Sequence, residues 1–454
     1  MASGLTKPIF LILALALAIR IGGAVYWQWS IPDGPSSLRF GDSDTYWVHA
    51  QRIANGEPYR YLSDEARIFR APLFPLFLSP FAYIASSSEL NQIDGPVLMV
   101  RMVGSLLGTF CVWLVWWLAK RTGGDHAANL AALFAAFYPG AIGMSIFVLS
   151  EMIFCPLMLG SLLCSSNAMI LKEQSRTYYA WILLAGFLTG LACLARPSWG
   201  LWAGLWWATA LARLLANPTW KQAVICGLTG GTFIVGITLA MGPWWIRNYH
   251  ITGKFVPSTL QVGASLYDGW HAGATGSSDE GMAFVDRYLK EQLEEDRSFE
   301  ALGRPKDSTL EWRLDRRMRN AAIQWVLENP SDAIRLGMVK FWKTWRPVPV
   351  AKELGSSAVR YAEGLGYVVI MVLGACGIWS TKWRPGAWLF ALPTVYFAVL
   401  HMAFIGSVRY RQPAVLVMCV LAGCGIVFLL ERIKLFKPEE LEISQRNNES
   451  NLEK

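Results

Sequence analysis

The sequence predicts an all-α protein that crosses a membrane many times, and three observations carry that prediction. Of the 454 residues, 54% are hydrophobic and only 16% are charged, whereas soluble domains carry about 25% charged residues. Apolar runs near 20 residues long, the length that spans a bilayer as a helix, recur along the chain. The 22 tryptophans fit aromatic belts at the two membrane interfaces. We therefore expect a polytopic helical membrane protein.

About ten apolar runs qualify as transmembrane helices. They lie at residues 8–27, 97–119, 126–146, 148–170, 178–195, 198–212, 223–246, 361–379, 387–405 and 412–430. The first run is long enough to span, and no cleavage site with small residues follows it, so we interpret it as a retained helix and not a signal peptide.

Basic residues in the links between spans predict the orientation. By the positive-inside rule, the side that carries them faces the cytoplasm. An even number of spans then places both termini in the cytoplasm. The residues on that side are Lys7, Lys120, Arg121, Lys172, Arg176, Arg213, Lys221, Lys382, Arg384, Arg432 and Lys434.

This pattern divides the chain into four parts. Residues 1–247 form an N-terminal transmembrane core that includes a first outer loop at 28–96. Residues 248–360 form an outer, periplasmic helical segment, and residues 361–436 form the C-terminal transmembrane helices. The polar residues 437–454 are predicted to form a disordered cytoplasmic tail.

The two outer parts contain shorter helices. Residues 44–55 are predicted to form an amphipathic helix that ends at Gly56 and lies in the membrane interface. The apolar run 71–85 is interrupted by three prolines, so a re-entrant or interfacial segment is expected there. In the second outer part, residues 286–297, 308–327 and 331–345 have helical patterns and predict a small helical cap.

Charge and cysteine usage argue against two other classes of protein: those that bind nucleic acid and those held together by zinc or disulfides. The formal net charge is +8, but no basic stripe with interleaved aromatic residues is present, so nucleic acid is not an expected partner. Anionic membrane lipids are the expected partner instead. All eight cysteines fall inside apolar runs without CxxC or zinc-like spacing, and they are interpreted as small apolar filling residues.

With this topology, several ionisable residues converge on the outer membrane face. They are Asp42, Asp44, Arg70, Glu151, Arg196, Arg247 and Arg409. Ionisable groups at membrane depth are costly and by default mark a substrate path. A carboxylate can take a proton and a fixed guanidinium can hold a phosphate, so the set favours group transfer from a phosphate-linked donor.

Each of these residues also has a purely structural interpretation. Asp42 could cap the helix that follows it, and Asp44 could be a first-turn charge that favours the helix dipole. Any one of the arginines could be an interfacial anchor that reaches lipid phosphates. Glu151 has apolar neighbours on both sides and needs a cationic partner.

Several short motifs together resemble one family. They occur in the family's order from the first span to the last: Asp42-Ser43-Asp44-Thr45-Tyr46, Arg70-Ala71-Pro72, Leu149-Ser150-Glu151, Leu194-Ala195-Arg196-Pro197, Pro243-Trp244-Trp245-Ile246-Arg247-Asn248 and Arg409-Tyr410-Arg411-Gln412-Pro413. With them the chain resembles the GT-C integral-membrane glycosyltransferases that use polyprenyl- or dolichyl-phosphate sugars. Protein O-mannosyltransferases and the lipid A aminoarabinose transferase are examples.

The resemblance implies a GT-C-like fold and a hexosyl or pentosyl transfer with inversion at the outer face of the cytoplasmic (inner) membrane. The donor would be a polyprenyl-phosphate sugar, and the acceptor a hydroxyl of a lipid, a glycan or a protein. The family's catalytic carboxylate corresponds to Asp42, with Asp44 as the second candidate. The residues expected to hold the donor phosphate are Arg70, Arg196, Arg247 and Arg409, with Glu151 as a supporting acid.

The resemblance leaves a bound metal open. Aminoarabinose-transferase-like members carry a Glu-Lys-Pro-Pro element whose acid is a metal ligand, and the corresponding stretch here is Phe69-Arg70-Ala71-Pro72. Arg70 can replace the lysine, but Phe69 cannot replace the acid. A divalent ion of the Mg, Mn or Zn type would then need an oxygen from Glu65, Asp64 or Glu151.

Two alternative functions are weighed against the transferase. A transporter or flippase of lipid-linked sugars often has repeated halves and charges buried in mid-span, whereas here no repeat is visible and the charges collect at one surface. An O-antigen polymerase or ligase type of enzyme depends on arginines in the outer loops and not on an early acid. The early aspartate favours the transferase.

Overall fold

In the computed structural model, the described part of the chain is built from helices and contains no strand. The described residues are 7–30, 38, 40–61, 63–87, 94–171, 173–216, 218–279, 282–303, 305–350, 357–381 and 386–433. The predicted tail at 437–454 lies outside them. So do Lys172, Lys382, Arg384 and Lys434 of the predicted charge pattern.

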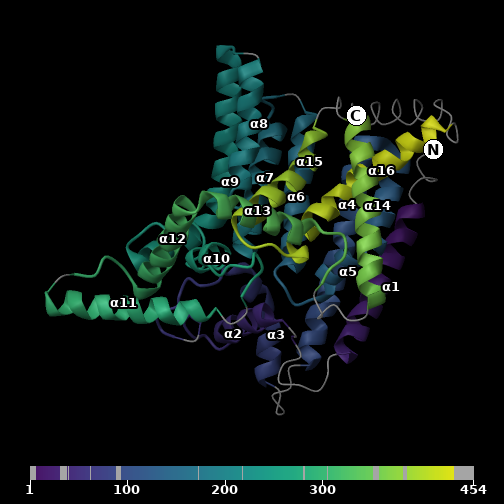
Figure 1. Ribbon diagram of the computed structural model, residues 1–454. Helices are drawn as coiled ribbons and strands as arrows, with labels where there is room; N and C mark the ends of the chain where they lie inside the picture. Colours follow the sequence, from purple (N-terminus) through teal and green to yellow (C-terminus); the bar gives the residue numbers. More distant parts are fainter. Residues whose placement is uncertain are drawn as a thin grey trace.

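A bundle of long helices forms the body of the molecule (Figure 1). Its members are α1 (Lys7–Trp29), α4 (Asp94–Phe137), α5 (Pro139–Ile146), α6 (Glu151–Met169), α7 (Arg176–Ala195), α8 (Trp202–Ala216), α9 (Trp220–Thr252), α14 (Ser357–Thr381), α15 (Trp388–Ala403) and α16 (Val408–Arg432). A single 3-10 turn, η1 (Pro197–Trp199), joins α7 to α8.

The polytopic membrane architecture is confirmed. Among the described residues, seven helices are long and apolar enough to cross a membrane, namely α1, α4, α6, α7, α9, α14 and α16. The helices α8 and α15 are apolar but shorter, at 15 and 16 residues. Each of the ten predicted spans coincides with one of these nine helices or, for 126–146, with the end of α4 and α5. The number of ten crossings stays a prediction.

The helix α4 contains two of the predicted spans because it folds back on itself. Gly124 inside it has φ 82° and ψ −172°, a backbone conformation that is essentially restricted to glycine. The indole of Trp116 donates to the side-chain oxygen of Asn129 at 3.0 Å, whereas thirteen residues of straight helix would separate them by about 20 Å. The two halves of α4 therefore run antiparallel.

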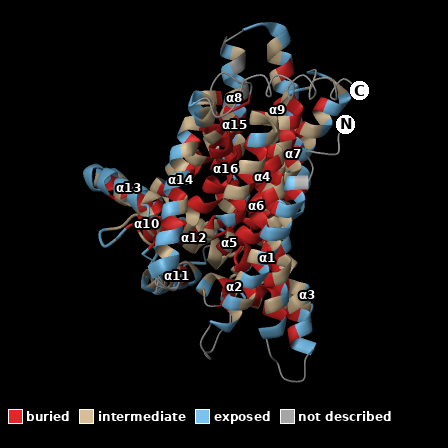
Figure 2. Cartoon of the chain, turned by 90° about the vertical axis from the view of Figure 1, so that its right-hand side faces the viewer, coloured by how far each residue is buried: buried red, intermediate tan, exposed pale blue. Residues whose placement is uncertain are grey.

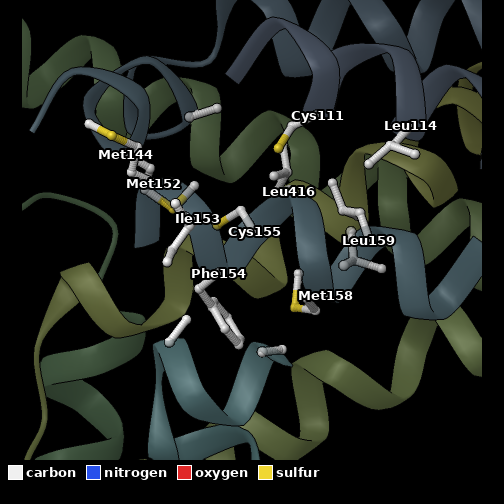
Figure 3. Packing of buried hydrophobic residues seen from close by; sticks show 14 of the residues in the cluster. Cys111, Leu114, Met144, Met152, Ile153, Phe154, Cys155, Met158, Leu159 and Leu416 are labelled. Carbon is white, nitrogen blue, oxygen red and sulfur yellow. Dashed lines mark hydrogen bonds between the residues drawn. The ribbon is translucent and has the colours of Figure 1, made fainter. Parts of the chain in front are cut away.

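The core lies around α16, which packs against α14, α15 and both halves of α4. Buried residues concentrate along the centre of the bundle (Figure 2). Figure 3 gives part of this core, where Cys111, Cys155 and Met158 lie among aliphatic and aromatic side chains. All eight cysteines are free, and six are buried, which confirms their interpretation as apolar filling residues.

The two ends of the bundle differ. The start of α1, the end of α16 and the connection between α8 and α9 lie at one end, called the α8–α9 end below (Figure 1). The helices α2 (Gly41–Ala54) and α3 (Leu73–Ser87) lie at the other, the α2–α3 end. The predicted helix 44–55 in fact begins at Gly41, and its N-cap is Phe40. Asp42 thus lies in the first turn, and the capping interpretation was wrong.

Between α9 and α14 the chain forms the α10–α13 segment, which consists of α10 (Val262–Gly269), α11 (Ala283–Ala301), α12 (Leu310–Glu328) and α13 (Pro330–Trp345). The three predicted helices of this segment are confirmed as α11, α12 and α13. The sequence analysis missed α10, which is only eight residues long and has glycine near both of its ends. Contacts of α12 with α10 and α11 hold the segment together, and contacts of α13 with α15 and α16 tie it to the bundle.

Candidate active site

Two carboxylates and three guanidinium groups alternate in a continuous chain of ion pairs at the α2–α3 side of the bundle. Arg70 contacts Asp42 at 2.7 Å, and the other oxygen of Asp42 accepts from Arg409 at 2.8 Å. Arg409 continues to Glu151 with Nε–Oε1 and Nη2–Oε2 distances of 2.6 and 3.0 Å. Glu151 finally pairs with Arg196. These five residues are called the charge chain below.

Helix ends bring the charge chain together. Asp42 lies in the first turn of α2, Glu151 is the first residue of α6, and Arg409 lies in the first turn of α16. The N-terminus of a helix carries a partial positive charge that stabilises anions. Arg196 follows the last residue of α7, and Arg70 belongs to the loop before α3. Three helix N-termini therefore add to the positive potential of the site.

The charge chain carries one excess positive charge, because three guanidinium groups face two carboxylates. The Glu151 side chain is only 1% exposed, accepts two hydrogen bonds from Arg409 and forms an ion pair with Arg196. The Asp42 side chain is 35% exposed, so the site opens to its surroundings at this residue. Burial alone would raise the pKa of Asp42, but Arg70 and Arg409 hold it below its ordinary value. Asp42 is therefore ionised at neutral pH.

A hydrogen bond and two aromatic rings hold the Arg70 side chain in place. Its Nη1 donates to the side-chain oxygen of Gln261 at 3.0 Å, and its guanidinium lies 5.0 and 5.1 Å from the ring centres of Tyr46 and Phe69. The Phe69 ring in turn stacks on Tyr61 with a centroid distance of 5.1 Å. Phe69, which replaces the acid of the related motif, thus supports the guanidinium by a cation–π contact.

A second, fully buried ion pair fixes the start of α16. Arg411, whose side chain is 0% exposed, donates to Glu363 of α14 at 3.0 Å. It also donates to the backbone oxygens of Arg346 and Pro347, and its guanidinium lies 3.6 Å from the ring centre of Tyr367. Because Arg409 lies two residues earlier in the same turn, this network determines where that guanidinium can reach.

Five of the predicted site residues meet in the charge chain, and four, Arg247, Asp44, Asp64 and Glu65, do not. Arg247 instead donates to the backbone oxygens of Arg67 and Tyr59 at 3.1 and 3.3 Å, and stacks on Trp244. Asp44 lies on the exposed side of α2, and Glu65 is exposed in the loop before Arg70. The sequence analysis missed Gln261 and the Arg411–Glu363 pair as parts of the site's framework.

The residues present do not fit a divalent metal. Asp42 and Glu151 each bond to two guanidinium groups, and a further cation would meet a site with an excess positive charge. Asp64 pairs with Arg60. Within the described part of the chain, no group of three or more His, Cys, Asp or Glu residues is placed to bind a metal.

Comparison with known proteins bears on the fold. Residues 75–255 match the family model of dolichyl-phosphate-mannose-protein mannosyltransferases. No curated protein sequence matches the chain. Among solved structures, the archaeal oligosaccharyltransferase AglB from Archaeoglobus fulgidus, in complex with an inhibitory peptide and a dolichol-phosphate, is similar with a TM-score of 0.57 and 14% identity. The similarity covers 96% of this chain and 52% of that one.

Two further solved structures are similar. The Archaeoglobus fulgidus oligosaccharyltransferase in complex with Zn and sulfate gives a TM-score of 0.57 at 15% identity, with 95% of this chain and 51% of that one covered. ArnT from Cupriavidus metallidurans, bound to undecaprenyl phosphate, gives 0.42 at 15% identity, with 93% and 78% covered. The chain spans about half the length of the oligosaccharyltransferase. The family match and the similarity to AglB confirm the predicted resemblance to GT-C glycosyltransferases at the level of the fold.

Proposed function

We propose that this protein is a membrane glycosyltransferase that moves a sugar from a polyprenyl-phosphate-linked donor to an acceptor hydroxyl. The observation that carries the proposal is the charge chain, which places an ionised, partly exposed aspartate between two arginines at one end of a membrane bundle. The GT-C fold and the match of residues 75–255 to a lipid-phosphate-dependent transferase family support it.

The proposed reaction is a single displacement. The acceptor oxygen attacks the anomeric carbon, the bond between that carbon and the phosphate oxygen breaks, and its electron pair leaves on the polyprenyl phosphate. Asp42 takes the proton of the acceptor hydroxyl. Attack from the side opposite the phosphate inverts the configuration at the anomeric carbon. Arg70 and Arg409 hold the phosphate as it gains charge.

The basicity of Asp42 depends on whether Arg70 and Arg409 bond to its carboxylate. While both guanidinium groups bond to its carboxylate, the lowered pKa makes Asp42 a weak base. A donor phosphate competes for the same N–H groups of Arg70 and Arg409. When these arginines turn to the phosphate, the carboxylate loses its cationic partners and its pKa rises. We propose that donor binding activates the base in this way.

The proposed orientation places the α2–α3 end on the outer face of the cytoplasmic membrane and both termini in the cytoplasm. Basic residues near the opposite end support this orientation, because Lys7, Lys120, Arg121 and Lys221 belong to the helix starts and links at the α8–α9 end.

The proposal is tested with purified protein, radiolabelled polyprenyl-phosphate sugars and a panel of lipid, glycan and peptide acceptors. We expect wild-type protein to transfer the label, and Asp42→Asn to lower kcat by about 10²- to 10⁴-fold, the range for loss of a general base. Asp44→Asn is the matched control, because this acid lies two residues after Asp42 on the exposed side of α2.

Two outcomes would contradict the proposal. If Asp42→Asn retains near-normal kcat while Asp44→Asn is inactive, the base is assigned to the wrong aspartate. If wild-type protein moves intact lipid-linked sugar across vesicle membranes without breaking the phosphate–sugar bond, the protein is a carrier and not a transferase.

A further inference from the structure

Two acids on one face of α12 contact the two backbone segments that flank the Arg70 side chain in space. One segment is the loop before α3, and the other is the start of α10. Glu311 and Asp315 are four residues apart, so their side chains lie one above the other. The Glu311 carboxylate accepts from the backbone N–H groups of Arg67 and Ile68 at 2.9 and 3.0 Å. These residues belong to the loop that presents the Arg70 guanidinium.

Asp315 fixes the opposite side. Its buried carboxylate accepts from the backbone N–H of Gly263 at 2.6 Å, in the first turn of α10. Gln261, which accepts from Arg70, is the N-cap of this helix. A backbone hydrogen bond also joins the two segments directly, because the N–H of Leu260 donates to the carbonyl oxygen of Ile68 at 3.0 Å.

Both backbone segments that determine the place of the Arg70 guanidinium are therefore bound to α12. Arg247 adds the complementary contact, since it donates to the carbonyl oxygens of Arg67 and Tyr59 in the loop whose N–H groups Glu311 accepts. Loss of the Glu311 carboxylate removes the acceptor of the Ile68 N–H and leaves the Arg67 N–H with the Glu65 carbonyl oxygen at 3.2 Å, so the loop can move away from Asp42.

We infer that Glu311 is a positioning residue for the donor phosphate and acts on it through Arg70. The inference rests on the proposed function, because it takes Arg70 as a phosphate ligand. It assigns to the α10–α13 segment, predicted from the sequence only as a small helical cap, a part in donor binding.

A double-mutant cycle tests the inference. The equilibrium binding of a polyprenyl phosphate in detergent micelles is measured for wild type, Glu311→Ala, Arg70→Ala and the double variant. We expect Glu311→Ala to weaken binding about tenfold, and the double variant to bind no more weakly than Arg70→Ala alone. Glu311→Gln keeps the volume and one acceptor oxygen, so it should lose less than Glu311→Ala.

Glu328→Ala is the matched control, because Glu328 ends the same helix in an exposed position. It should bind as wild type does. Thermal unfolding of every variant establishes that the protein is folded. If Glu311→Ala fails to fold, the cycle is run with Glu311→Gln.

The outcomes separate the inference from the proposed function. If the wild-type protein binds the lipid phosphate but the two losses add in the double variant, Glu311 acts independently of Arg70 and the inference is wrong. If wild-type protein does not bind the lipid phosphate at all, the proposed function itself fails.

Discussion

The carboxylate of Asp42 is shared by two guanidinium groups that lie 28 and 367 positions away in the sequence. Such an arrangement keeps an acid ionised in a site from which water is partly excluded. In the proposed function, an incoming phosphate competes with the Asp42 carboxylate for the same two guanidinium groups. At the scale of single residues, the central question is therefore which anion the arginines hold.

A first prediction concerns Glu151, whose side chain is 1% exposed between Arg196 and Arg409. Glu151→Gln removes the charge, so Arg196 faces a neutral amide and Arg409 keeps Asp42 as its anionic partner. Removing one partner of a buried ion pair typically costs about 3–5 kcal/mol. We expect a lower thermal unfolding temperature in detergent and loss of transfer. Glu173→Gln, an exposed acid between α6 and α7, should change neither quantity.

A second prediction concerns the pH dependence of stability. Burial raises the pKa of Glu311 to about 7, although the N–H groups of Ile68 and Arg67 oppose this shift. Asp315 raises the pKa and Arg247 lowers it. The folded protein therefore binds the proton more tightly than the unfolded chain does, and this stabilisation is lost as the pH rises through about 7. Thermal unfolding at pH 5 and pH 7.5 should reveal a stability difference that Glu311→Gln lacks. An equal pH dependence in both proteins would contradict the prediction.

The separate site residues could be predicted from the sequence only where chemistry made them conspicuous. Asp42, Glu151 and Arg409 stand out because charges next to apolar spans are costly. Gln261 and Glu311 carry no such signal, since polar residues are ordinary in a polar segment. Arg247 was as conspicuous as Arg70, but its contacts with backbone oxygens depend on loop geometry, which local sequence does not encode.

At the scale of elements, hydrophobic runs predicted most of the helices because a membrane span needs a long apolar segment. The helix α10 was missed because eight residues are too few to show a helical period. The start of α2 was predicted three residues late because Gly41 precedes the pattern. Only the structure places Asp42 in the first turn of α2, where it points toward the arginines and does not cap the helix.

A third prediction tests the reversal inside α4. An added Cβ at Gly124 would meet no neighbouring atom, but its φ of +82° is strained for any residue with a side chain. Gly124→Ala should therefore destabilise the protein by about 1–3 kcal/mol through backbone strain alone. Gly227→Ala in α9 also meets open space but lacks the positive φ, so it should be neutral or slightly stabilising. The comparison of their thermal unfolding temperatures measures the strain.

At the scale of the whole molecule, the charge chain connects α2, α6, α7 and α16 with the loop before α3. Its members come from both halves of the sequence, so the site exists only when the bundle is assembled. The orientation of that bundle across the membrane decides from which compartment a donor and an acceptor can enter.

A fourth prediction tests this orientation by cysteine labelling in intact cells. In a background where the two partly exposed cysteines, Cys226 and Cys376, are replaced by serine, a membrane-impermeant maleimide should label Asp64→Cys. It should label Lys221→Cys, at the α8–α9 end, only after the membrane is permeabilised. Both positions are exposed. The reverse pattern would place the site in the cytoplasm and contradict the proposed orientation.

The unequal number of cations and anions in the charge chain has a consequence for turnover. A sugar phosphodiester arrives with one negative charge, whereas the released phosphomonoester carries about 1.5 to 2 negative charges at neutral pH. A site with one surplus cation attracts the departing lipid more strongly than the arriving one. Slow escape of that lipid should limit the steady-state rate, so the first turnover in rapid-quench kinetics should be faster than those that follow.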